Sequence, residues 1–161
     1  MALGEGDKLP SGKLLQMTEN GPAAVDLADY QTGRVAIFAL PGAYTGTCST
    51  QHVPSFIRTA DQFRGKGVDR IVCISVNDPF VMGAWATDTG ADKAGLTFLS
   101  DADGAFTKAM GMNFDAPPAG LLGRSKRYAM LVEDGTITAF QAEESPGQCS
   151  VSGGESLLER A

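Results

Sequence analysis

The stretch Val35–Ser49, VAIFALPGAYTGTCS, joins an apolar run to a cysteine, and it decides the fold of this chain. Residues 35–40 are apolar and partly β-branched, which predicts a central strand. Pro41 and Gly42 end that strand. Cys48 then lies at the start of the next predicted element, a helix over residues 49–64. N–H groups at a helix start stabilise a thiolate, so the position suits a reactive cysteine as well as it suits a buried structural one. The hydroxyl of Thr45 and the arginines downstream favour the reactive cysteine.

The alternation of strands and helices continues beyond this stretch. Pro54 is expected to bend the 49–64 helix unless it falls in the first turn. Asp78-Pro79 is a helix start, with aspartate as cap and proline at the first helical position. Residues 113–123, which contain two prolines, are predicted to be a loop, and the N-terminal third has no firm assignment. The remaining predicted elements are strands 68–76, 96–99, 127–133 and 136–142, and helices 80–87, 103–110 and 155–160.

This order of elements predicts an α/β fold, with a central mixed β-sheet flanked by helices. The strands at 35–40 and 68–76 are joined through a helix and are therefore expected to lie parallel. No repeat, low-complexity segment or linker interrupts the chain. We therefore predict a single domain over residues 1–161.

Composition excludes several classes of partner. The 161 residues carry a net charge of -6, which argues against nucleic acid and against anionic membrane surfaces. No apolar run approaches the ~20 residues that span a bilayer. Residues 1–7 are acidic and lack the pattern of a signal peptide, and residues 158–161 are not a peroxisomal address. We therefore expect a cytoplasmic protein.

The cysteine count argues against a disulfide framework. The chain has three cysteines, Cys48, Cys73 and Cys149, and no two of them form a Cys-x-x-Cys pair. With a single histidine, His52, a conventional zinc site is not expected. We therefore predict no metal and no other cofactor.

Three motifs resemble those of the peroxiredoxins. Pro41, Thr45 and Cys48 match the pattern Pro-x-x-x-Thr-x-x-Cys of the peroxiredoxin active site. The longer run around them, together with the segments 75–78 and 124–130, resembles the type II, or peroxiredoxin-5-like, subfamily over nearly the whole chain. The resemblance implies a thioredoxin-like fold. The family most often has proline where this chain has Gly46, and glycine there loosens the loop.

The resemblance also assigns the site residues. Cys48 is the nucleophile whose thiolate attacks a peroxide, and the hydroxyl of Thr45 hydrogen-bonds the thiolate and the peroxide. By family match, Arg127 is the cation that favours the thiolate and stabilises charge on the leaving oxygen. Pro41 is expected to shield and shape the loop. Arg124 and Lys126, which lie close to Arg127 in sequence, are expected to be solvated.

His52, four residues after Cys48, allows a second interpretation. A cysteine–histidine pair on one helical face is the arrangement of an acyl-transfer nucleophile, so a hydrolase is one alternative. The interpretation that we favour is a histidine that packs or forms hydrogen bonds, since the family has histidine here without using it as a base.

The cysteine that resolves the sulfenic acid on Cys48 stays open. Cys149 lies in a segment rich in glycine and proline, and it matches the resolving position of animal relatives. Cys73 lies among apolar residues of a predicted strand, where a thiol is usually inert, although some plant relatives are thought to use it. With neither, an external thiol would do the work.

The predicted function is a thiol peroxidase for antioxidant defence. Its expected substrates are hydrogen peroxide and alkyl hydroperoxides, and its expected reductants are glutathione with glutaredoxin, or thioredoxin. Family members of this type commonly form dimers, so we expect a homodimer. The rival hypothesis is a peroxide sensor that binds partners and turns over little; steady-state turnover separates the two.

Overall fold

The computed structural model describes residues 2–161, apart from the side chain of Cys48. Among these residues, seven strands form one mixed sheet in the order β2-β1-β5-β4-β3-β8-β9. The strands are β1 (Lys13–Thr18), β2 (Gly21–Asp26), β3 (Arg34–Ala39), β4 (Arg70–Ser75), β5 (Thr97–Ser100), β8 (Tyr128–Glu133) and β9 (Thr136–Ala142). β3, β4 and β5 run parallel, and β8 pairs antiparallel with β3. The predicted mixed sheet and its parallel pair are therefore confirmed.

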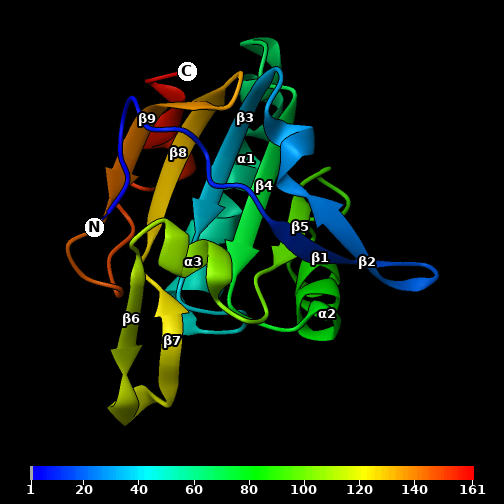
Figure 1. Ribbon diagram of the computed structural model, residues 1–161, viewed down its shortest axis with the longest axis vertical. Coiled ribbons are helices and arrows are strands. Elements are labelled where there is room, and N and C mark those ends of the chain that lie inside the picture. Colours follow the sequence, from blue (N-terminus) through cyan, green and yellow to red (C-terminus); the bar gives the residue numbers. More distant parts are fainter. Residues whose placement is uncertain (1) are drawn as a thin grey trace.

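Helices cover both faces of this sheet. They are α1 (Val53–Gly65), α2 (Pro79–Thr89), α3 (Ala105–Ala109) and α4 (Gly154–Leu158). In Figure 1, α3 lies in front of the sheet and α1 lies behind it. Asp78 caps α2 through a hydrogen bond from the Val81 N–H to Oδ1 (2.8 Å), as the sequence predicts.

The central strands are buried on both faces because their alternate residues enter two separate cores. In β3, Ala36 and Phe38 pack with α1, α2 and α4, whereas Val35 and Ile37 pack on the α3 side. A strand covered on both sides has no polar face, which explains the unbroken apolar run from which the strand was predicted. Among the described residues, no helix combines the length and the apolar character needed to cross a membrane.

A second, two-stranded sheet corrects the prediction of a loop over 113–123. β6 (Asn113–Ala116) pairs antiparallel with β7 (Leu121–Ser125), and a short 3₁₀ turn (Pro117–Ala119) joins them. The prolines occupy that turn, where their fixed φ is tolerated. The hairpin projects beyond the end of the main sheet, at the bottom of Figure 1.

Candidate active site

The loop after β3 is held by hydrogen bonds from the end of β4 and from β7 of the second sheet. The Ala43 N–H donates to Asn77 Oδ1 (2.9 Å), and the Ser75 hydroxyl donates to the same oxygen (2.6 Å). Arg124, on β7, donates from Nη1 to the Pro41 carbonyl (3.2 Å) and is half-buried. The expectation that Arg124 is solvated was therefore wrong, because the hairpin places it against the loop. Lys126 is exposed, as expected.

The helix after this loop begins with a widened turn. The Ser49 N–H donates to the Thr45 carbonyl (3.0 Å), and a π-helix runs over Cys48–His52 before α1 starts at Val53. Pro54 falls in the first turn of α1, where its missing N–H is tolerated. The backbone of Cys48 thus lies in the first turns of a helix, as predicted, while its side chain lies outside the described residues.

The hydroxyl of Thr45 has a defined orientation. Oγ1 donates to the Gly42 carbonyl (2.8 Å), three residues back. The hydroxyl proton is therefore used in the hydrogen bond to Gly42, and the lone pairs of the oxygen remain able to accept a hydrogen bond. In this orientation Thr45 is suited to receive the O–H of a peroxide rather than to donate to a thiolate.

Arg127, just before β8, is a buried cation. Arg127 is 2% exposed, and its Nε and Nη2 both donate to the Pro146 carbonyl (3.1 and 3.0 Å). Nη1 contacts Nδ1 of His52 at 2.9 Å. A guanidinium stays charged wherever it lies, so this site holds a fixed positive charge in a region of low dielectric. The alternative of a surface charge at a strand end does not hold.

His52 is fully buried, and both ring nitrogens are engaged. Because arginine can only donate, Nδ1 accepts from Arg127, and Nε2 therefore carries the hydrogen that it donates to the Ser152 carbonyl (2.9 Å). The ring also packs against Phe38 and Phe56. No lone pair is left to act as a base, which favours the packing interpretation of His52 over the hydrolase.

Burial of His52 should make stability depend on pH. Burial, followed by the charge of Arg127, lowers the pKa of His52 to about 3, from 6.5. The unfolded chain binds a proton below pH 6.5 that the folded protein does not, so the free energy of unfolding falls as the pH drops below 6.5. The slope from this group approaches about 1.4 kcal/mol per pH unit. Urea unfolding of the wild type and of His52→Gln, between about pH 7 and pH 5, measures it; parallel slopes would contradict the assignment.

An open pocket of about 300 Å³ brings the predicted residues together. Pro41, Thr45 and Arg127 line it, along with Thr47, the residue before Cys48. The β6–β7 hairpin supplies an apolar wall opposite them, formed by Phe114, Ala116, Ala119 and Leu121. The sequence prediction missed this wall, since it treated the hairpin as a loop. Phe114 and Leu121 were the available signal, as apolar residues in a stretch otherwise predicted to be irregular.

The residues 145–153, here called the Cys149 segment, lie along the same helix start. The Thr47 hydroxyl donates to the Gly147 carbonyl (3.1 Å), and Pro146 is the acceptor for Arg127. Cys149 is half-buried and lines a second pocket of about 310 Å³ with residues of the π-helix and α1. The segment that carries the predicted resolving cysteine therefore touches the predicted active site.

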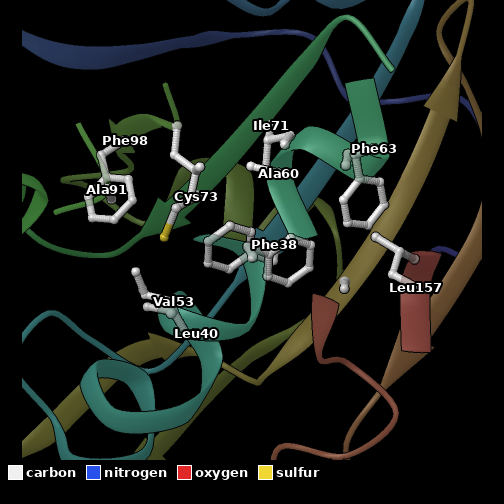
Figure 2. Close-up of a cluster of buried hydrophobic side chains, with 14 of the residues drawn as sticks. Phe38, Leu40, Val53, Ala60, Phe63, Ile71, Cys73, Ala91, Phe98 and Leu157 are labelled. Carbon is white, nitrogen blue, oxygen red and sulfur yellow. The ribbon is translucent and has the colours of Figure 1, made fainter. Parts of the chain in front are cut away.

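Cys73 lies elsewhere. It is fully buried on β4, in the core between the sheet and helices α1 and α2. Figure 2 shows its sulfur among apolar side chains, near Val53 and Leu40. A thiol in such surroundings is shielded from solvent and from the pocket, which is the setting that the prediction of an inert Cys73 requires.

Trp85, on α2, contacts the residue that follows Cys48. Its indole Nε1–H donates to Ser49 Oγ (3.0 Å), and its ring is fully buried against Phe98. The adjacent Tyr44 has a positive φ of 65° and donates from its hydroxyl to Asp88 (2.6 Å). Helix α2 thus supports the loop and the helix start from the side away from Arg127.

In the part of the chain that the structure describes, no three His, Cys, Asp or Glu side chains form a group that could hold a metal ion. The polar groups around the pocket are instead the N–H groups of a helix start, the hydroxyl of Thr45 and the buried guanidinium of Arg127. Such a set stabilises negative charge.

Comparison with known proteins identifies the family. Residues 4–158 match the family model Redoxin. Peroxiredoxin-2C of Oryza sativa subsp. japonica is 43% identical over 162 residues, which cover 95% of this chain and 94% of the relative. The mitochondrial Peroxiredoxin-2F of Arabidopsis thaliana is 47% identical over 133 residues. These cover 82% of this chain and 66% of the length of that relative. Reduced Prx3 of Vibrio vulnificus in complex with H2O2 superposes with a TM-score of 0.90 at 39% identity, covering 98% of each chain.

Proposed function

This chain is a type II peroxiredoxin with a thioredoxin-like fold, a thiol peroxidase of antioxidant defence, and from that premise we propose which residues perform the reaction. The nucleophile is Cys48, Thr45 binds the peroxide, Arg127 stabilises the developing charge and Pro41 closes the loop over the thiolate. The observation that supports this assignment is the pocket in which the buried guanidinium of Arg127 faces the loop that leads into Cys48.

The proposed reaction starts from the thiolate of Cys48. The sulfur attacks one oxygen of the peroxide, the S–O bond forms as the O–O bond breaks, and the second oxygen leaves with the electron pair. That oxygen takes up a proton and departs as water or alcohol, leaving a sulfenic acid on Cys48. Arg127 lowers the barrier because its charge is in place before the leaving oxygen becomes negative.

The substrate range follows from the two walls of the pocket. The polar wall, with Thr45 and Arg127, suits the –OOH group that every peroxide presents. The apolar wall of the β6–β7 hairpin suits an organic group attached to it. We propose that the protein reduces hydrogen peroxide and, against this wall, organic hydroperoxides; the Vibrio vulnificus neighbour was crystallised with H2O2.

Leu121→Asn should therefore change the preference between peroxides. We expect kcat/KM for an aromatic hydroperoxide to fall by roughly three- to tenfold, because the apolar contact is lost, while the value for hydrogen peroxide stays unchanged. Leu122→Asn is the matched control, since Leu122 is 65% exposed and points away from the pocket. Equal losses for both peroxides, or the same effect at Leu122, would argue against the apolar wall.

We propose Cys149 as the resolving residue. Its thiolate attacks the sulfenic sulfur of Cys48, the S–O bond breaks, and the hydroxide leaves as water after gaining a proton, so that an internal disulfide remains. Its support is the contact of the Cys149 segment with Thr47 and Arg127. The disulfide would be reduced by thioredoxin, whereas glutathione with glutaredoxin would serve a sulfenic acid that is not resolved internally.

Cys149→Ser gives the direct test of that step. After one equivalent of peroxide, we expect the intact mass of the variant to rise by one oxygen, where the wild type loses two hydrogens. The rate of peroxide attack should be unchanged, while turnover with thioredoxin should fall. If the variant still forms an internal disulfide, Cys149 is not the resolving residue.

We also propose a homodimer and a cytoplasmic location. The homodimer rests on the family alone, and light scattering of the reduced protein tests it. The location rests on the sequence composition, and relatives include proteins named mitochondrial and chloroplastic.

Steady-state turnover tests the function as a whole. Consumption of peroxide, coupled to oxidation of NADPH through thioredoxin and its reductase, or through glutathione and glutaredoxin, should continue for many cycles per protein. A single equivalent consumed, with no turnover under either system, would favour the sensor hypothesis instead.

A further inference from the structure

The carboxylate of Glu143 is hydrogen-bonded to the Cys149 segment. Just after β9, Glu143 Oε2 accepts hydrogen bonds from the N–H of Ser150 (2.8 Å) and from the N–H (2.7 Å) and hydroxyl (2.6 Å) of Ser152. Oε1 accepts from the Ser150 hydroxyl (3.2 Å). One side chain thus binds the two residues that flank Val151, directly after Cys149.

These hydrogen bonds are made to an ionised group. Burial raises the pKa of Glu143, but the hydrogen bonds from Ser152 and Ser150 together outweigh it and lower the pKa below 4.5. The carboxylate is therefore charged at neutral pH, and hydrogen bonds to a charged acceptor are about twice as strong as neutral ones. Glu143 is thus a strong point of attachment for the segment.

In the arrangement that the structure shows, here called closed, Cys149 lies beside the helix that begins at Cys48. A Cβ placed on Gly153 would lie 3.8 Å from both Cys149 Sγ and Ser55 Oγ, and both residues line the same pocket. Ser55 is seven residues after Cys48, so the two residues are separated by the π-helix and the start of α1. A disulfide requires Cα atoms within about 7 Å of each other. We take the segment, or the first turns of the helix, to move before the two sulfurs meet.

We propose that Glu143 is a positioning residue that sets how fast Cys149 reaches the sulfenic acid on Cys48. The carboxylate keeps the segment closed while peroxide reacts, and its release from Ser150 and Ser152 frees the backbone beside Cys149. The inference rests on the proposed resolving role of Cys149. It adds that the slow part of resolution is the opening of the Glu143 hydrogen bonds rather than the attack of one sulfur on the other.

The first experiment measures the rate of disulfide formation by rapid quench and intact mass. In Glu143→Ala, which loses all four acceptor contacts, we expect an increase on the order of tenfold, because hydrogen bonds to a charged group hold the closed state. Glu143→Gln keeps an acceptor but not the charge and should lie between the two. Glu144→Gln, with the same change in charge one residue along and an exposed side chain, should match the wild type.

The second experiment reports on the segment without any peroxide chemistry. In a Cys48→Ser background, iodoacetamide should alkylate Cys149 several times faster after Glu143→Ala. After Glu144→Gln, the rate of alkylation should equal that of Cys48→Ser alone. Circular dichroism in the far ultraviolet confirms that each variant is folded, so that faster alkylation reports local opening.

The outcomes separate this inference from the one on which it rests. Unchanged or slower disulfide formation in Glu143→Ala, in a wild type that does form the disulfide, overturns the role of Glu143. If the wild type forms no internal disulfide, the resolving role of Cys149 is overturned, and alkylation alone then decides whether Glu143 holds the segment closed.

Discussion

Cys48→Ser should consume hydrogen peroxide at least roughly a thousandfold more slowly than the wild type, because a serine hydroxyl is not ionised at neutral pH and is a far weaker nucleophile than a thiolate. Stopped-flow measurement of peroxide consumption under single-turnover conditions gives the rate. The mass of the variant after one equivalent of peroxide should stay unchanged. The helix start is present in this variant as well, so the loss isolates the sulfur itself.

Cys73→Ala is the matched control for that loss. Cys73 is buried in the apolar core between the sheet and α1, where it neither lines the pocket nor meets solvent. We expect its rate to equal that of the wild type, with a modest loss of stability from the small cavity. Wild-type rates in Cys48→Ser, or a comparable loss in Cys73→Ala, would overturn the assignment of the nucleophile.

Arg127→Ala should slow peroxide attack by roughly a hundred- to a thousandfold. The variant loses the fixed charge that favours the thiolate and the leaving oxygen, and it leaves the Pro146 carbonyl and Nδ1 of His52 without their donor. The pKa of the Cys48 thiol should rise accordingly. The rate of alkylation by iodoacetamide against pH measures that pKa, and stopped flow measures the attack.

Two further variants decide what the effect at Arg127 means. Lys126→Ala removes the exposed cation one residue away and should leave both quantities unchanged. Arg127→Lys keeps the charge but cannot form the planar fork that reaches Pro146 and His52 together, so we expect partial recovery. An Arg127→Ala protein that is folded by circular dichroism, with an unchanged thiol pKa and an unchanged rate, would remove Arg127 from the mechanism.

The centre of the fold was predictable because its sequence signals agree with its surroundings. β3 and β4 carry apolar runs over residues 35–39 and 71–74, and burial on both faces demands that composition. Asp78-Pro79 gives the start of α2 locally, through a cap and a residue that needs no N–H donor. The helix after the cysteine loop was predicted over 49–64, but the π-helix over Cys48–His52, which puts Pro54 at the start of α1, had no signal in the sequence.

The β1–β2 and β6–β7 hairpins were missed because their own sequences carry only weak strand signals. β1 pairs with β2 through the two-residue turn Glu19-Asn20, and the weak strand pattern on either side of it gave no firm prediction. β6 and β7 are short and half-exposed, and two prolines lie between them. Their pairing depends on the closing of the turn and on the contact of Arg124 with the loop after β3.

The contacts that surround the site were not predictable from residue type. Arg127 was placed at the site by its family motif, but its partners, Pro146 and His52, are separated from it by 19 and 75 residues. Glu143 carried no signal, because an acidic residue after a strand is ordinarily solvated. Such contacts depend on which distant segments of the chain the tertiary fold brings together, and periodicity and local propensity do not encode that.

The hydrogen bond between Trp85 and Ser49 gives the protein a built-in optical signal. Trp85 is the single tryptophan of the chain, so the emission of the protein at long wavelength comes from one indole. That indole is tied to the residue after Cys48 and is otherwise buried in the core. Any unwinding of the helix start would free its N–H and change the polarity around it. The wavelength and intensity of the Trp85 emission therefore report whether the helix start at Cys48 is wound or unwound, without an added label.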